Sequence, residues 1–100
     1  MKPNNDGAAK TTALMIKEVT DSLNHLLQEK NLRYGNSALS PLNIFSKDDA
    51  ITGIKIRMDD KLMRIKTSKE LRKNDLVDYI GYGVLLCIAN DWLNFDELID

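Results

Sequence analysis

Four charged residues with helical spacing form the pattern in this chain that could most readily do chemistry. They lie in the segment IKIRMDDKLMRIK, at offsets i, i+3, i+4 and i+7, and are Arg57, Asp60, Lys61 and Arg64. Residues at these offsets share one side of a helix. Guanidinium and ammonium groups in such a row can bind phosphate oxygens, the guanidinium in a two-pronged manner. The row is therefore a candidate site for an anionic ligand.

A second predicted helix, beginning NDLVDYIGYG, supplies opposing groups. It carries Asp75, Asp78 and Tyr82 at offsets i, i+3 and i+7 among mostly apolar residues. A buried carboxylate without a partner is strongly unfavourable, so a cation must lie nearby. Two interpretations stay open: Asp78 pairs with Arg57 or Arg64 and only fixes the helix register, or some donors remain free for a phosphate. We call the group between the two helices the charged seam: Arg57, Asp60, Lys61, Arg64, Asp78 and Tyr82.

The segment KNLRYG adds Lys30, Arg33 and Tyr34 at the predicted end of the first helix. An aromatic ring beside basic groups can stack on a base and bind a phosphate. Cations also stabilise the C-terminal end of a helix, which is the alternative explanation of the two basic residues. We include the three residues in the predicted ligand site.

Metal binding is the weaker alternative. Glu18 and Asp21 form one pair of carboxylates with helical spacing, and Asp75 and Asp78 form another, which together could hold magnesium. However, the first pair points away from the apolar stripe of its own helix, which favours a solvated face. The lone His25 does not make a zinc site, and no nucleophile triad, P-loop or dinucleotide motif occurs. We expect no catalytic residue and no cofactor, with magnesium at Asp75 and Asp78 only under the alternative.

Length and composition predict one small domain. A chain of 100 residues buries one modest core, and its net charge of -1 gives no general attraction to nucleic acid or anionic membranes. The single cysteine, Cys87, cannot form an intrachain disulfide. No apolar stretch reaches the ~18 residues of a membrane span. We expect a cytoplasmic protein that does not bind membranes or specific nucleic acid.

Hydrophobic periodicity predicts an all-α fold with three main helices and a short C-terminal helical or docking segment. Residues 1–9 have the composition of a disordered tail, and residues 10–100 form the helical domain. The first helix spans about 10–31, with Gly35 as its stop. The second begins near Lys47 or Asp48 after a capping box from Ser46 to Asp49, and ends near 66. The third ends near 89, and either Ser68 or Asn74 is its N-cap.

The predicted second and third helices carry more apolar surface than one small subunit can cover. The second has a main apolar stripe and a smaller one from Ile56 and Met63, and apolar side chains surround the third almost completely. Gly81 and Gly83 in the third helix would permit close approach of another helix. The sequence thus predicts a helical bundle that assembles into a homo-oligomer.

The segments RYGNS, IRMDDKLMRIK and NDLVDYIGYGVLL together resemble a phage and prophage family known as the nucleotide modification associated domain, first type. The resemblance covers about residues 30–90. It matches the family pattern at Arg33, Tyr34, Gly35, Arg57, Asp60, Lys61, Arg64, Asp78 and Tyr82. The chain departs from the pattern at Asp75, where the family spacing favours Asn74 as the polar residue. A more distant similarity is to the all-α nucleoside triphosphate pyrophosphatases of the MazG kind, whose paired acidic motifs are half reproduced.

The resemblance implies a small helical protein in a phage nucleotide context, located in the host cell cytoplasm. We expect a non-catalytic protein that binds a nucleotide or cyclic nucleotide at the predicted site and sequesters a nucleotide-derived host defence signal. Two alternatives stay open. One is a magnesium-dependent nucleoside triphosphate pyrophosphatase or nucleotide-modification enzyme, and the other is a structural adaptor whose seam consists of ion pairs alone.

Overall fold

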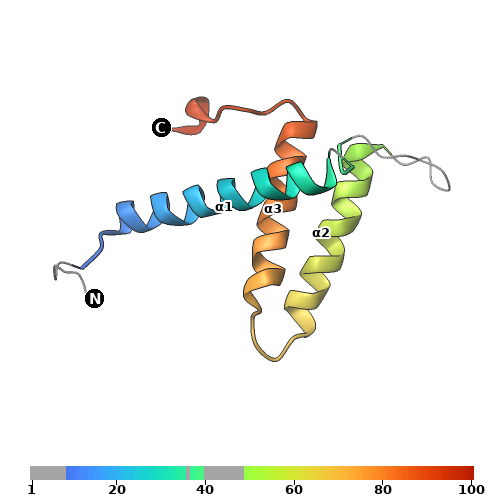
Figure 1. Ribbon diagram of the computed structural model, residues 1–100, viewed down its shortest axis with the longest axis horizontal. Helices are drawn as coiled ribbons and strands as arrows, with labels where there is room; N and C mark the ends of the chain where they lie inside the picture. The colour runs from blue at the N-terminus through green and yellow to red at the C-terminus, as the bar shows by residue number, and fades with distance from the viewer. Residues whose placement is uncertain (1–8, 36, 40–48) are drawn as a thin grey trace. The chain divides into compact units, whose positions relative to one another are not determined.

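The computed structural model describes residues 9–35, 37–39 and 49–100. These residues form α1 (Thr12–Tyr34), α2 (Ala50–Thr67), α3 (Lys73–Ala89) and a one-turn 3-10 helix, η1 (Asp96–Leu98) (Figure 1). The described residues contain no strand, which confirms the predicted all-α class. The chain divides into two units, Met1–Arg33 and Tyr34–Asp100, and each is described by itself.

Helix α1 is a long, solvent-exposed helix. The Thr11 hydroxyl accepts a hydrogen bond from the Leu14 backbone N–H at 3.2 Å, which satisfies one of the free donors of the first turn. The helix ends three residues later than expected and is followed by Gly35 at φ +62, the left-handed conformation predicted for its stop. Within its unit, the apolar stripe is exposed, with Ile16 60% and Val19 64% accessible.

The acidic side of α1 is occupied by exposed ion pairs. Glu18 pairs with Lys10 at 2.6 Å, and Asp21 pairs with Lys17 one helical turn away. All four side chains are at least 60% exposed. Exposed pairs of this kind add little stability. The geometry agrees with a solvated face for Glu18 and Asp21.

Helix α2 begins at Ala50, later than the predicted start near Lys47 or Asp48. Asp49 is the N-cap residue, and its carboxylate accepts a hydrogen bond from the Thr52 backbone N–H at 2.7 Å. This bond lowers the pKa of Asp49 from its ordinary value. The prediction that Asp49 closes a capping box begun by Ser46 is therefore wrong, because Asp49 is itself the N-cap residue. Ser46 and the loop around it lie outside the described residues.

Helix α3 begins at Lys73, and Arg72 occupies the N-cap position without a side-chain cap. Both predicted caps, Ser68 and Asn74, are therefore wrong. Ser68 instead terminates α2, where its backbone N–H and its hydroxyl both donate to the Arg64 carbonyl oxygen, at 3.0 and 2.6 Å. Asn74 lies inside the first turn of α3. The two ends near 66 and 89 were predicted to within one residue.

Helices α2 and α3 pack against each other as an antiparallel pair joined by a short turn, which we call the tip (residues 68–72) (Figure 1). Ile54, in the second turn of α2, is only 1% exposed. Gly81 is buried, and a Cβ on Gly83 would lie 3.9 Å from the Cε of Met58. The added Cβ would thus make an ordinary van der Waals contact, so Gly83 does not mark an unusually close approach of the two helices.

The remaining apolar surface of the pair is open. Ile56 and Met63 of α2 are 48% and 57% exposed, and Ile80 and Ile88 of α3 are each 42% exposed. Within the unit Tyr34–Asp100, α2 packs on α3. Coverage of this surface by a second subunit stays a prediction.

The C-terminal segment, which we define as residues 91–100, contains the predicted short helical turn, η1. Asp91 adopts φ 61, and the Trp92 backbone N–H then donates to the Cys87 carbonyl oxygen at 2.9 Å. The Asn94 side chain accepts from the Asp96 backbone N–H at 2.8 Å. In the described part of the chain, no helix has the length and apolar content needed to cross a membrane.

Candidate ligand site on the α2–α3 pair

Two contacts across the antiparallel pair define the centre of the charged seam. The Lys61 Nζ lies 3.0 Å from the Asp78 Oδ2, and the Arg57 Cζ lies 5.9 Å from the centroid of the Tyr82 ring. Arg57 and Lys61 are one turn apart on α2, and Tyr82 and Asp78 are one turn apart on α3. Because the helices run in opposite directions, moving one turn towards the C-terminus of α2 corresponds to moving one turn towards the N-terminus of α3. The seam is therefore a ladder of paired side chains.

The structure pairs Asp78 with Lys61, whereas Arg57 or Arg64 was predicted as its partner. Lys61 lies seven residues after the buried Ile54, which places it within ~20° of the direction that faces α3. Arg57 and Arg64 deviate from that direction by ~60° and ~80°. The Lys61 and Asp78 side chains are only 18% and 23% exposed. Their attraction is consequently less screened by water than that of a surface pair.

The contact between Arg57 and Tyr82 combines a cation with an aromatic face. Its distance of 5.9 Å is near the outer limit of about 6 Å for a favourable cation–π contact. Arg57 is exposed while Tyr82 is half-buried. The guanidinium is therefore accessible to a ligand, and the ring supplies a fixed apolar surface beside it.

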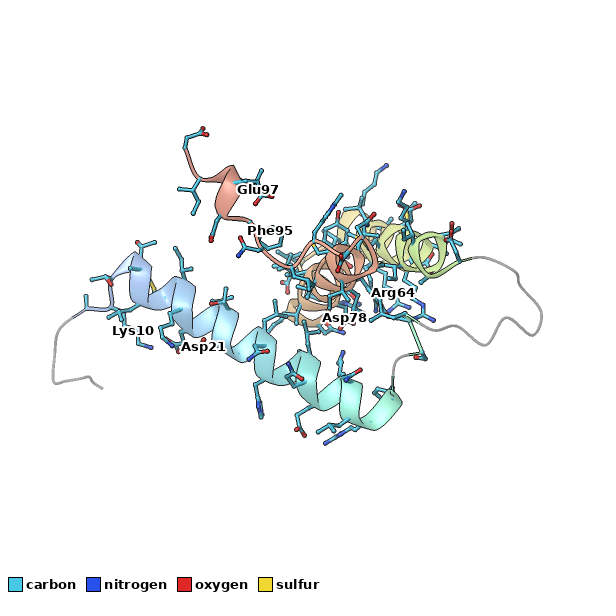
Figure 2. The ribbon with its side chains drawn as sticks, turned by 90° about the horizontal axis from the view of Figure 1, so that it is seen from above. Lys10, Asp21, Arg64, Asp78, Phe95 and Glu97 are labelled. Carbon is cyan, nitrogen blue, oxygen red and sulfur yellow. The ribbon has the colours of Figure 1, made fainter. Side chains whose placement is uncertain are left out.

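Arg64 and Asp60 complete the α2 side of the seam, and both are exposed. Figure 2 shows Arg64 and Asp78 on the same side of the α2–α3 pair. The antiparallel register that matches Lys61 with Asp78 places Arg64 near the level of Asp75, one turn closer to the tip. The cationic edge thus extends over two turns of α2, or about 10 Å.

Asp75 is the residue whose environment differs most from the sequence interpretation. It is 2% exposed, although it was assigned only to the alternative metal site. It lies in the first turn of α3, where free backbone N–H groups and the helix dipole favour a carboxylate. No buried side-chain nitrogen or oxygen among the described residues lacks a hydrogen-bond partner. The position in the first turn was visible in the sequence, but the burial was not.

The described residues contain no cluster of three or more His, Cys, Asp or Glu side chains that could hold a metal ion. Asp78, one of the two carboxylates of the alternative site, is engaged by Lys61. Magnesium binding there would require the ion to compete with an ammonium group that already lies against the carboxylate.

Lys30, Arg33 and Tyr34 all lie in the last turns of α1 and are exposed, Tyr34 to 69%. Because α1 is described by itself, grouping these three residues with the charged seam stays a prediction. The structure brings together Arg57 with Tyr82 and Lys61 with Asp78, and it places Arg64 and Asp60 on the same helix.

No family model, curated protein or solved structure matches the chain. The resemblance to the phage nucleotide modification associated domain therefore stays a prediction based on the motifs alone.

Proposed function

We propose that this protein binds a nucleotide or nucleotide-derived small molecule, such as a cyclic nucleotide, at the charged seam and does not turn it over. The observation that carries the proposal is the stack of Arg57 on Tyr82 directly beside the Lys61–Asp78 pair. An aromatic face and accessible cations one helical turn apart are the two elements that a nucleotide requires. Either element alone would be an ordinary feature of a helical surface.

The individual residues have distinct roles in this proposal. Arg57 and Arg64 are the exposed guanidinium groups, and each can donate two parallel hydrogen bonds to a phosphate. Lys61 is held by Asp78, so it contributes a positioned ammonium whose charge is partly neutralised. The Tyr82 ring, with the Arg57 guanidinium over it, supplies the aromatic part of the site. Arg33 and Tyr34 of α1 belong to the same proposed site on the strength of the sequence resemblance, and Lys30 belongs to it as part of the basic cluster beside Tyr34.

A binding role rather than catalysis is proposed because the half-buried carboxylate of the seam is already paired with an ammonium. A phosphohydrolase of the magnesium-dependent type needs free carboxylates to hold its metal. Incubation with a nucleotide panel and magnesium, followed by chromatography, should leave every compound intact. Conversion of any nucleotide would replace this proposal with the enzyme alternative. Sequestration of a host defence signal is the biological role that we propose from the phage resemblance.

The direct test is calorimetric titration of the protein with mono-, di-, tri- and cyclic nucleotides. Replacing Arg64 with Gln should weaken the binding of any ligand found by at least ~10-fold, because a charged phosphate contact is worth ~1.5–3 kcal/mol. The fold should remain stable, since Arg64 is exposed. Lys55→Gln is the matched control, because Lys55 is also exposed on α2 but lies on the opposite flank from the seam.

Three outcomes would contradict the proposal. The wild-type protein binds no nucleotide of the panel, Lys55→Gln weakens binding as much as Arg64→Gln does, or Arg64→Gln unfolds the protein. The third result would show that the seam is a structural ion-pair network, as in the adaptor alternative.

A further inference from the structure

The C-terminal segment (residues 91–100) combines acidic charge with unusual apolar exposure. It contains four acidic residues and no Lys, Arg or His, a net charge of −4. Five large apolar side chains are 52–77% exposed: Trp92, Leu93, Phe95, Leu98 and Ile99. A contiguous exposed apolar cluster with charged neighbours is typical of an interaction surface.

The backbone of this segment is held in a defined conformation. The hydrogen bond from Trp92 to the end of α3 and the Asn94 turn lead into η1, where the Leu98 N–H donates to the Phe95 carbonyl oxygen at 2.9 Å. Phe95, Leu98 and Ile99 are thus displayed at offsets i, i+3 and i+4. Within the described residues of the unit Tyr34–Asp100, no helix packs on η1. Figure 2 shows Phe95 and Glu97 on the segment that leaves the end of α3.

The opposite end of the α2–α3 pair has the complementary character. Residues 66–73, which include the tip, contain four basic residues and one acidic residue, a net charge of +3. Leu71 within this stretch is 60% exposed, and Leu62 and Met63, one turn earlier on α2, are 49% and 57% exposed. We call residues 62–73 the basic end. Its charge is opposite to that of the C-terminal segment, and both surfaces expose large apolar side chains.

The two surfaces of one chain lie at opposite ends of α3 (Figure 1). The 17 residues of α3 span ~25 Å, whereas the six residues from Asn90 to Phe95 reach at most ~20 Å when fully extended. Trp92, Leu93 and Phe95 therefore cannot reach the tip (residues 68–72) of their own chain. A second copy can present its basic end without this restriction.

We propose that the C-terminal segment of one copy docks on the basic end of another copy. Burial of the exposed apolar side chains would supply the affinity, and the opposite charges would fix which surfaces meet. Because the two contacting surfaces differ, the contact is heterologous, and its repetition produces a ring or an open chain of subunits. Arg57, Lys61 and Tyr82 lie outside both surfaces, whereas Arg64 of the proposed nucleotide site lies within the basic end.

The experiment is analytical ultracentrifugation of the full chain over a range of protein and salt concentrations. The wild-type mass should rise above the 11.3 kDa of one chain with protein concentration and should fall towards it as salt is added. Lys69→Glu with Lys73→Glu should shift the association to at least ~10-fold higher concentration, since each rim charge affects association modestly. Glu at position 73, in the first helical turn, also suits the helix dipole and preserves the fold.

Asp96→Lys with Glu97→Lys should weaken association in the same way. An equimolar mixture of the two double variants should associate again, because the unchanged C-terminal segment of the basic-end variant can dock on the unchanged basic end of the C-terminal variant. Lys10→Glu with Lys17→Glu is the matched control with the same change in net charge, and it should associate as the wild type does. A wild type of one-chain mass under all conditions, insensitivity to the basic-end variant, failure of the mixture, or dissociation of the control would each overturn the proposal.

Discussion

The Lys61–Asp78 pair allows a quantitative test of the structure. At the observed separation of 3.0 Å, two unit charges attract with ~5–6 kcal/mol if the effective dielectric constant is about 20. Desolvation and the ordering of both side chains offset most of this attraction. Exposed pairs yield about 0.2–1 kcal/mol, and breaking a fully buried pair costs about 3–5 kcal/mol. With side chains 18% and 23% exposed, this pair should fall between those limits.

We therefore predict a coupling free energy of ~1–3 kcal/mol between Lys61 and Asp78, measured by a double-mutant cycle. The variants are Lys61→Met, Asp78→Asn and their combination, since Met retains the length of Lys and Asn retains the size of Asp. The free energy of unfolding is obtained from urea denaturation followed by far-ultraviolet circular dichroism.

Lys55→Met is the control for loss of an exposed α2 lysine and should change the free energy of unfolding by less than ~0.5 kcal/mol. A coupling free energy near zero would refute the reasoning, because the two groups would then not be in contact in solution. A coupling above that of an exposed pair, with a silent control, would confirm that the seam is organised as described.

Two further predictions concern local features of the helices. The carboxylate of Asp49 caps α2, and its pKa is lowered from 3.8 in the folded state, so its stabilising effect exists above pH 3.8 and is lost as the pH falls through the lower folded pKa. The difference in unfolding free energy between the wild type and Asp49→Ala should therefore be largest near neutral pH and shrink in acid, and a difference that does not vary with pH would contradict the cap. Gly83→Ala should stabilise the protein by ~0.5–1 kcal/mol, because the added Cβ lies 3.9 Å from Met58 and the glycine penalty inside α3 is removed. Urea denaturation tests this change, and a loss of stability would show that the helices are closer than described.

The sequence alone determined the helices because helix formation depends on near neighbours. The periodic apolar residues of α2 and α3, the glycine after α1 and the turn residues between helices are local signals, and they predicted the all-α class and several helix ends. Cap assignment was less certain because several polar residues near one helix start compete for the same backbone donors. Ser46 was predicted as the cap of α2, but the cap is Asp49, the residue directly before the first helical residue.

The pairing within the charged seam required the tertiary structure. Sequence spacing placed Arg57, Lys61 and Arg64 on one side of α2, but it did not give the rotation of α2 about its own axis relative to α3. That rotation is set by burial of Ile54, which turns Lys61 rather than either arginine towards Asp78. The same rotation leaves both arginines exposed and therefore accessible to a ligand.

The burial of Asp75 and the exposure of Ile80 and Ile88 were likewise decided only by packing. A carboxylate in the first turn of an apolar helix, and isoleucines in its middle and its last turn, suggest the reverse when residue type alone is considered. Burial depends on which neighbour covers each position, and that neighbour is distant in the sequence. Residue type and spacing determined which side chains share a face of each helix. The contact between α2 and α3 decided which of those faces is covered, because the local sequence of one helix does not specify the neighbouring helix that covers it.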